Sequence, residues 1–209
     1  MNECIIVGAG SFFGLRRPPE PGDLLIAADG GYRHCRQVEL TPDLLLGDFD
    51  SLPQLPQGIP LLRLPVEKDD TDMLRAIKEG LTRGYKHFQL YGGTGGRLDH
   101  TLANLQSLLY LARRGARGVL YDQNMAFTAL TGGGRAVLCG HPGDLFSLFS
   151  LEAQARDVCI RGGQYPLEHA QLTADFPLGV SNHFLNETVE ISLGEGALLL
   201  GWQLPGTLL

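Results

Sequence analysis

The fold is decided by the stretch Tyr91-Gly92-Gly93-Thr94-Gly95-Gly96-Arg97-Leu98-Asp99-His100-Thr101. It follows an apolar run, residues 87–91, that predicts a buried strand, and it leads into a periodic segment, residues 102–113, that predicts a helix. Glycines in such a turn let backbone N–H groups approach a ligand, and the start of the helix adds unpaired donors. Arg97 adds a planar cation, and Asp99, just before the helix, can cap it or accept a hydrogen bond. The stretch favours binding of phosphate oxygens; the alternative is a tight turn without a ligand.

The glycine pattern matches neither of two common nucleotide-binding motifs. A P-loop needs a Lys-Ser/Thr pair after its last glycine, and the dinucleotide fingerprint needs a third glycine where Leu98 stands. A second glycine-rich stretch, residues 8–14, is one residue too long for that fingerprint and leads into a proline-rich segment. We therefore expect residues 8–14 to form a loop, and any phosphate site in the chain to follow another pattern.

Composition indicates a globular chain of one or two domains. It has 209 residues, 44% of them hydrophobic, and no apolar run long enough to span a membrane. The start of the chain lacks the basic region of an export signal, so a soluble cytoplasmic protein is expected. The four cysteines, Cys4, Cys35, Cys139 and Cys159, lie far apart in sequence, and this spacing predicts neither a zinc site nor a disulfide framework.

The charge pattern indicates which kinds of ligand the chain is suited to bind. A formal net charge of −6 argues against general binding to nucleic acid. Acidic residues are concentrated between Asp43 and Asp72. Carboxylates beside a phosphate site would repel the ligand unless a divalent cation lay between them, so the pattern predicts a metal ion.

The order of predicted elements favours an α/β domain followed by a smaller all-β domain. Strands are expected at residues 3–10, 23–28, 44–46, 61–65, 87–91 and 119–121, with helices at 32–38, 73–83 and 102–113. Such alternation predicts a mostly parallel sheet flanked by helices. Beyond Asp122 short extended segments follow at 127–130, 135–138, 144–151, 157–160, 171–174, 189–193 and 197–202, with a possible helix at 167–170. They favour a small antiparallel β-sandwich, and the expected domains are residues 1–123 and 124–209.

Acidic residues come directly after several predicted strands. This holds for Asp29, Asp48, Asp50 and the 68–72 segment, and the glycine turn likewise follows a predicted strand. Because the carboxyl ends of parallel strands meet at one edge of a sheet, we expect these segments to converge there. An extended backbone through Phe49 would point Asp48 and Asp50 the same way, toward one hard cation. Each group also has a purely structural alternative. Asp48 and Asp50 could be turn residues, residues 69–72 could cap a helix, and Asp29 could form an Asx turn.

Three further positions have ordinary explanations as well. His100 suits a helix start that points to solvent, Trp202 suits a core, and Ser181-Asn182 suits a plain turn.

Taken together, the motifs resemble the thiamine pyrophosphokinase family. The matching stretches are Ala28-Asp29-Gly30-Gly31, Leu46-Gly47-Asp48-Phe49-Asp50-Ser51, Lys68-Asp69-Asp70-Thr71-Asp72, Gly93-Thr94-Gly95-Gly96-Arg97-Leu98-Asp99-His100 with Ala103-Asn104, and Gly179-Val180-Ser181-Asn182. The resemblance implies an α/β nucleotide domain, a β-sandwich and a homodimer with thiamine sites at the subunit interface. It implies Mg²⁺-dependent transfer of pyrophosphate from ATP to the hydroxyl of thiamine, giving thiamine diphosphate and AMP.

The resemblance also implies roles for individual residues. Magnesium would be bound by Asp48, Asp50 and Asp72. The catalytic residues would be Asp29, Lys68, Asp69, Arg97 and Asp99. ATP would be bound by Asp29, Gly30, Thr71, Gly93, Thr94, Gly95, Gly96, Arg97, Asp99 and His100, and thiamine by Ser181, Asn182 and Trp202. Leu74 and His183 stand where relatives often have Glu. The rival hypotheses are a Mg²⁺-dependent nucleotide phosphohydrolase and a sensor of nucleotide or thiamine without catalysis.

Overall fold

The computed structural model describes residues 2–49, 56–64 and 69–204. The chain divides into two compact units. Among the described residues, the first unit comprises those up to Ser107 together with Gly115–Gln123, and the second comprises Leu108–Arg114 and residues 124–204. Among the residues that the structure describes, no helix combines the length and the apolar character needed to cross a membrane.

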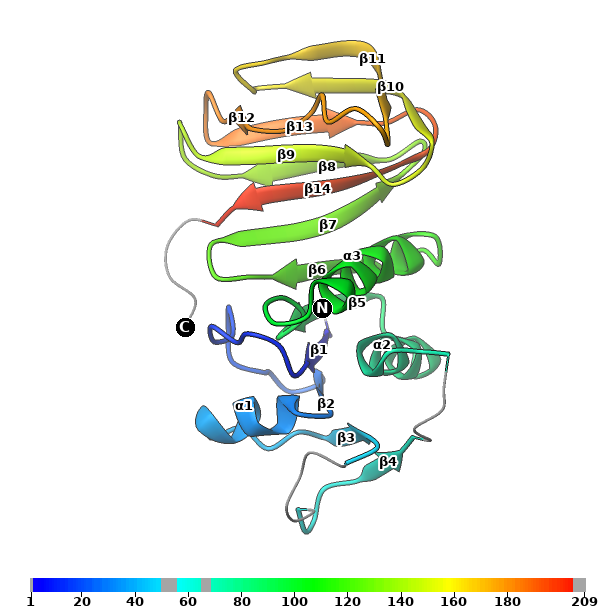
Figure 1. Ribbon diagram of the computed structural model, residues 1–209. Helices are drawn as coiled ribbons and strands as arrows, with labels where there is room; N and C mark the ends of the chain where they lie inside the picture. Colours follow the sequence, from blue (N-terminus) through cyan, green and yellow to red (C-terminus); the bar gives the residue numbers. More distant parts are fainter. Residues whose placement is uncertain (1, 50–55, 65–68, 205–209) are drawn as a thin grey trace. The chain divides into compact units, whose positions relative to one another are not determined.

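A parallel sheet forms the centre of the first unit (Figure 1). Its strands lie in the order β6-β5-β1-β2-β3-β4, and every neighbouring pair is parallel. Their bounds are β1 Cys4–Val7, β2 Leu24–Ala28, β3 Leu44–Gly47, β4 Leu61–Arg63, β5 His87–Tyr91 and β6 Arg117–Tyr121. All residues of β1, β2 and β3 are buried, which explains why these strands appear in the sequence as continuous apolar runs.

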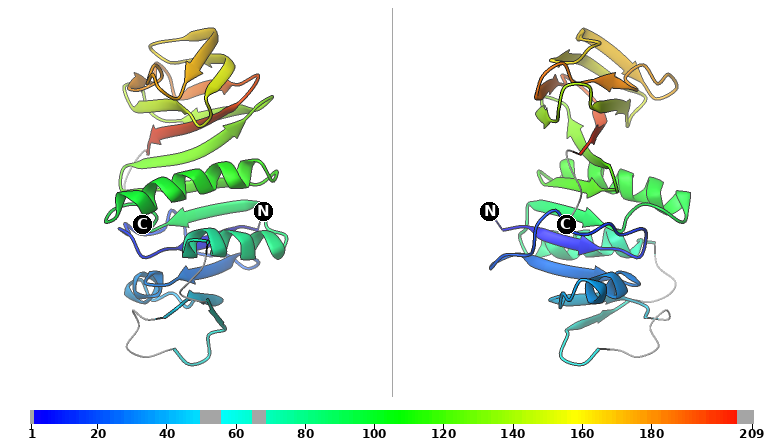
Figure 2. Two further views of the ribbon diagram at one scale, coloured as in Figure 1. Left: turned by 45° about the vertical axis from the view of Figure 1, so that its right-hand side comes forward. Right: turned by 90° about the vertical axis from the view of Figure 1, so that its left-hand side faces the viewer.

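Helices cover both faces of this sheet. Their bounds are α1 Gly31–Gln37, α2 Asp72–Thr82 and α3 Leu98–Ala112. Cys35 of α1 packs in a buried cluster with Ile5 and Leu25 on one face. On the other face, Gly80 of α2 lies against Phe88 and Cys4. Figure 2 shows α2 and α3 on the same side of the sheet. The expected α/β class with a mostly parallel sheet is confirmed.

The start of α3 differs from the prediction. The helix begins at Leu98 rather than at Leu102, so Asp99 lies within its first turn and is not the residue that precedes it. Leu98 and Leu102 are 71% and 55% exposed, so no buried apolar residue marks the true start. Apolar periodicity detects only the part of a helix that faces a core, and the helix therefore begins earlier than its pattern suggests.

The second unit is a β-sandwich. One antiparallel sheet has the order β12-β9-β14-β7 and the other the order β11-β10-β13-β8. The strands are β7 Met125–Thr131, β8 Arg135–Cys139, β9 Leu145–Ser150, β10 Gln154–Arg161, β11 Leu167–Thr173, β12 Asn182–His183, β13 Thr188–Ser192 and β14 Ala197–Gln203. A single buried cluster joins both sheets, with Phe146 and Leu200 from one and Val158 and Ile191 from the other. This confirms the predicted all-β architecture.

Two local predictions in this unit are wrong. The possible helix at Leu167–Ala170 is part of strand β11, because these residues pair with β10 through Leu167 opposite Ile160 and Ala170 opposite Val158. Ser181-Asn182 is not a plain turn, since Asn182 belongs to the short strand β12 and pairs with Phe146. Pairing with another strand decided both cases, and the pattern within a single segment does not contain that information.

Candidate active site

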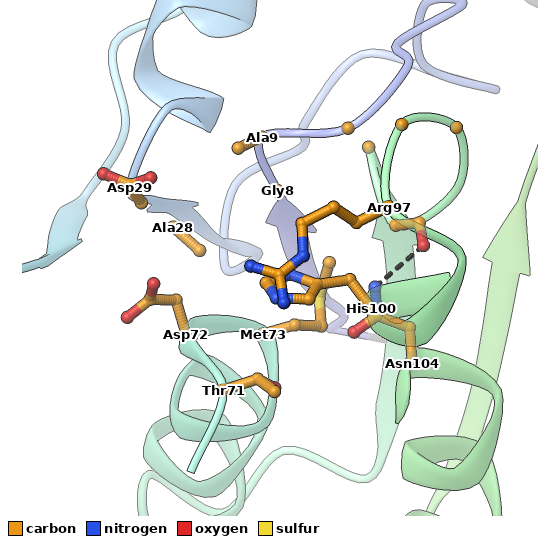
Figure 3. Close-up of a pocket in the computed structure, with 15 residues that line it drawn as sticks. Gly8, Ala9, Ala28, Asp29, Thr71, Asp72, Met73, Arg97, His100 and Asn104 are labelled. Atoms are coloured by element: carbon orange, nitrogen blue, oxygen red, sulfur yellow. Dashed lines mark hydrogen bonds between the residues drawn. The ribbon is translucent and has the colours of Figure 1, made fainter. Parts of the chain in front are cut away.

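A cleft of about 310 Å³ lies at the carboxyl ends of the parallel strands (Figure 3). Segments from four parts of the first unit meet there: the loop after β1, the end of β2, the start of α2, and the turn from β5 into α3. The lining residues are Gly8, Ala9, Gly10, Ala28, Asp29, Thr71, Asp72, Met73, Gly92, Gly93, Gly95, Gly96, Arg97, His100 and Asn104. Residues that are distant in sequence therefore share one cavity at the edge of the sheet where ligands of such folds gather.

Two glycine loops are joined along one side of the cleft. The amides of Gly8 and Gly10 donate to the carbonyls of Tyr91 and Gly92, each at 2.8 Å, and the amide of Ser11 donates to Thr94 O at 2.7 Å. A Cβ added at Gly10 would lie 2.7 Å from Gly92 O, which is too close for any side chain. Gly92 itself has a positive φ of 61°. Glycine is thus required on both loops for their backbones to meet.

Side chains behind the β5 turn hold it in place. The buried amide of Asn104 donates to Gly93 O at 2.8 Å. The Thr94 hydroxyl donates to Asp122 Oδ1 at 2.6 Å, and Thr94 is buried and does not line the cleft. Asn104 and Asp122 therefore fix the backbone of the turn, and Thr94 acts here as an anchor of that backbone.

Asp29 and Asp72 line one side of the cleft (Figure 3). Asp29 follows β2 with a positive φ of 48°, and its amide donates to Leu46 O at 2.7 Å. Asp72 is the first residue of α2, whose N-cap Thr71 accepts a hydrogen bond from Leu74 N at 3.2 Å. The strand end and the helix start thereby fix two negative charges at one wall.

Asp48 follows β3 beside this wall. The ends of β2 and β3 are in contact, because a Cβ added at Gly47 would lie 3.2 Å from Asp29 Cα. Asp48 is partly buried and is not among the residues that line the cleft. The extended backbone expected through Phe49 is wrong: β3 ends at Gly47, and Phe49 is buried with a φ of 67°. Asp50 lies outside the described residues.

Arg97 and His100 occupy the opposite side of the cleft (Figure 3). Two hydrogen bonds join Arg97 to Asp99, from Nη2 to Oδ2 at 2.6 Å and from Nε to Oδ1 at 3.1 Å. The Arg97 guanidinium lowers the pKa of Asp99 to about 2. Asp99 is not a lining residue, so it orients Arg97 from outside the cleft. The cation and the acidic wall thus face one cavity.

Other predicted site residues of this unit lie around the cleft. Gly30 is the N-cap of α1 and does not line the cavity. Asp69 is exposed and does not line it either, and Asp70 pairs with Lys78 at 2.6 Å. Lys68 lies outside the described residues. Of the described residues in the acidic run before α2, Asp72 is the acid that lines the cleft.

The predicted thiamine-binding residues belong to the second unit. Asn182 is buried; its Oδ1 accepts from Tyr165 N at 3.0 Å and its Nδ2 donates to Tyr165 O at 2.7 Å. Ser181 is exposed with a φ of 60°, and its amide donates to Ser147 Oγ at 3.1 Å. Trp202 lies on β14 opposite Ala126 and packs partly against the core. Asn182 therefore organises the backbone at Tyr165, beside the exposed Ser181.

Sequence reasoning gave no individual role to seven of the lining residues: Gly8, Ala9, Gly10, Ala28, Met73, Gly92 and Asn104. The glycines after β1 failed the dinucleotide spacing and were expected to form only a loop. The available signal was their position directly after a buried strand, which places them at the same edge as the acids. Met73 gave no signal, because an apolar residue in the first turn of a helix usually indicates packing.

Comparisons with solved structures define the class of fold. The structure of thiamine pyrophosphokinase from Bacillus subtilis matches with a TM-score of 0.87 at 22% identity, covering 97% of this chain and 99% of that one. That of thiamin pyrophosphokinase from Geobacillus thermodenitrificans matches with a TM-score of 0.83 at 24% identity over 99% and 100%. Thiamin pyrophosphokinase from Candida albicans matches at 0.77 with 13% identity over 98% and 89%. The chain shares one fold class with these proteins.

Sequence comparisons identify the family. The family model of the thiamin pyrophosphokinase catalytic domain matches residues 20–120, and that of the vitamin B1 binding domain matches residues 139–198. A thiamine pyrophosphokinase of Bacillus subtilis is 25% identical over 183 residues, which are 85% of this chain and 86% of that protein. The chain belongs to the thiamin pyrophosphokinase family and is an enzyme of that family, as the motifs indicated.

Proposed function

We propose that this chain transfers the pyrophosphoryl group of ATP to the hydroxyl of thiamine in a Mg²⁺-dependent reaction, giving thiamine diphosphate and AMP. The observation that carries the proposal is the cleft at the strand ends, where Asp29 and Asp72 face Arg97 across a glycine-lined cavity. A triphosphate needs backbone donors, a cation and a means of neutralising nearby carboxylates; the glycines of the β5 turn and Arg97 line this cleft and would supply the first two. Membership of the family supports the identity of the substrates.

The acidic wall fits a hard divalent cation. Mg²⁺ prefers oxygen ligands and is usually bound by one or two carboxylates together with phosphate oxygens and water. Asp72 lies in the cleft opposite Arg97, and Asp48 follows the strand end that contacts Asp29. We propose Asp48, Asp50 and Asp72 as the magnesium ligands, with Asp29 beside them. When bound, Mg²⁺ would neutralise charge on the transferring group.

The protein's own groups would position the reactants. Backbone N–H groups of the turn at 93–96 and the Arg97 guanidinium would bind phosphate oxygens. The thiamine hydroxyl oxygen would attack the β-phosphorus, the bond from that phosphorus to the oxygen of the α-phosphate would break, and AMP would leave. Such transfers depend mostly on alignment and on stabilisation of charge. Arg97 has five N–H donors and two of them bond to Asp99, so its remaining donors could bind phosphate oxygens while Asp99 holds the side chain.

The proton of the attacking hydroxyl requires an acceptor. Asp69 and Asp99 are two of the catalytic carboxylates that the family resemblance implies, and both are candidates for this role. With its pKa lowered to about 2 by Arg97, Asp99 is a weak base at neutral pH. Asp69 is exposed and does not line the cleft. Asp29 lines the cleft, and we propose it as the acceptor.

Thiamine would be bound by Ser181, Asn182 and Trp202, in a homodimer whose subunits share the thiamine sites. The role of Asn182 here is to hold the Tyr165 backbone, since its amide already bonds to both backbone groups of that residue. Light scattering of the purified chain would measure its mass, and a monomer that retains full activity would contradict a shared site.

Incubation of the purified chain with ATP, Mg²⁺ and thiamine tests the reaction, with mass analysis of the products. We expect AMP and thiamine diphosphate in equal amounts, and neither without Mg²⁺. Release of inorganic phosphate or pyrophosphate in the absence of thiamine would instead identify a phosphohydrolase. A Mg²⁺-dependent rise in melting temperature with ATP but no product would identify a sensor.

A further inference from the structure

Three side chains that can bind a metal meet on the surface of the second unit. Asp157 and Cys159 belong to β10, and His169 belongs to the neighbouring strand β11. A carboxylate oxygen, the thiol sulfur and a ring nitrogen of these residues all lie within 4.8 Å of one another. The cluster belongs to a different unit from the cleft described above, and none of its residues is among those assigned to the proposed transfer.

Irregular pairing of the two strands brings the three residues together. The register between β10 and β11 shifts between Ala155 and Val158 and again between Val158 and Ile160, so that His169 lies across from the section containing Asp157 and Cys159. Asp157 and His169 both have left-handed backbones, with φ of 56° and 49°. Conformations of this kind cost free energy and are enriched at binding sites. The bulge therefore gathers side chains that regular strands would keep further apart.

The three groups already interact with one another. His169 Nδ1 lies 2.5 Å from Asp157 Oδ1, and the amide of His169 donates to Cys159 Sγ at 3.4 Å. The side chains of His169 and Asp157 are 81% and 57% exposed, so this pair is screened by water and stabilises the fold little. Exposure also leaves an open path for an ion from solvent, and a position for water as a further ligand.

We propose that Asp157, Cys159 and His169 bind a transition-metal ion of the zinc type. Thiolate, imidazole and carboxylate are the ligands of Zn²⁺, and Mg²⁺ has little affinity for the first two. In a tetrahedral zinc site, neighbouring ligand atoms lie about 3.3–3.8 Å apart, which small side-chain rotations would reach from the observed separations. Binding releases the thiol proton of Cys159 and replaces the contact between His169 and Asp157. The ion would link β10 to β11.

Titration of the metal-free, full-length chain with Co²⁺ tests the proposal. Co²⁺ occupies zinc sites, and a Co²⁺–thiolate bond gives an intense near-ultraviolet absorption. We expect this absorption to saturate at one equivalent of Co²⁺ and to disappear when Zn²⁺, which binds more tightly, is added. Excess Mg²⁺ should not remove it. Absence of any thiolate absorption in the wild-type chain would overturn the proposal.

Variants locate the ion. Cys159→Ser should abolish the absorption, and Asp157→Asn and His169→Gln should each weaken binding by at least about tenfold. The matched control is Cys139→Ser, because Cys139 is the other cysteine that is not buried. An absorption that survives in Cys159→Ser, or is lost in Cys139→Ser, would show that the ion is bound elsewhere.

A second measurement is independent of spectroscopy and of folding defects in the variants. Iodoacetamide labelling of the wild-type chain, followed by peptide mass analysis, reports the reactivity of each cysteine. We expect Zn²⁺ to slow labelling at Cys159 and to leave labelling at Cys139 unchanged. Equal rates at Cys159 with and without Zn²⁺ would contradict the proposal.

Discussion

At the scale of single residues, Asp72 offers the sharpest test of the cleft. Asp72→Asn keeps the size of the side chain and removes its charge, so metal and phosphate binding should weaken while the fold is unchanged. We expect kcat/KM for thiamine diphosphate formation to fall by at least about a hundredfold. The matched control is Asp70→Asn, in the same segment, whose carboxylate pairs with Lys78. Equal activity of the two variants would remove Asp72 from the site.

The Arg97–Asp99 pair makes a prediction about pH. Arg97 lowers the pKa of Asp99 to about 2, against an ordinary value of about 3.9. A lowered pKa means that any stabilisation from the pair is present above pH 4 and is lost as the pH falls through 2. Titration of the Asp99 carboxyl by NMR should give a midpoint near 2 in the wild type. In Arg97→Ala the midpoint should return to the ordinary value, and an unchanged midpoint would contradict this explanation.

At the scale of elements, the start of α2 depends on its cap. Thr71→Ala removes the hydrogen bond from Leu74 N, and the free energy of unfolding should fall by about 1 kcal/mol. Urea denaturation measures this change without reference to activity. Thr82→Ala, at the exposed end of the same helix, is the control and should change stability by less than about 0.5 kcal/mol. The same loss in both variants would mean that the cap contributes nothing special.

Helices and strands could be predicted from the sequence where their buried apolar residues form a continuous run or a periodic pattern. The strands of the parallel sheet and the helices α1 and α2 appear close to their expected positions. The apolar pattern failed where an element has few buried apolar residues or is defined by its pairing with another strand. Examples are the exposed first turn of α3, the two-residue strand β12, and the Leu167–Ala170 segment of β11.

The candidate site could likewise be predicted from the sequence only in part. The sequence predicted that Asp29, Asp72 and the glycine turn lie close together, because the carboxyl ends of parallel strands meet at one edge of a sheet. The contact between the loops after β1 and β5 did not, because it is made by backbone atoms that the sequence does not reveal. Cysteine spacing predicted no zinc site, and the site proposed at Asp157, Cys159 and His169 draws its residues from two strands, which such spacing does not reveal.

At the scale of the whole molecule, the sandwich core should dominate the stability of the second unit. Phe146 is fully buried between the sheets, whereas Phe149 on the same strand is 38% exposed. Phe146→Ala should lower the free energy of unfolding by about 3–5 kcal/mol. Phe149→Ala should cost about 1 kcal/mol or less. Thermal or denaturant unfolding of both variants checks this, and similar losses would mean that β9 does not have one face in the core.

The backbone hydrogen bonds between the loops after β1 and β5 limit which substitutions the protein can tolerate. If every position of the chain were varied and active clones were sequenced, most of the cleft would accept some replacement of similar chemistry. Positions 10 and 92 would accept none, not even alanine, because a single extra carbon there separates the two halves of the binding edge. Intolerance at these two positions would show that the two loops must contact each other directly through their backbone atoms.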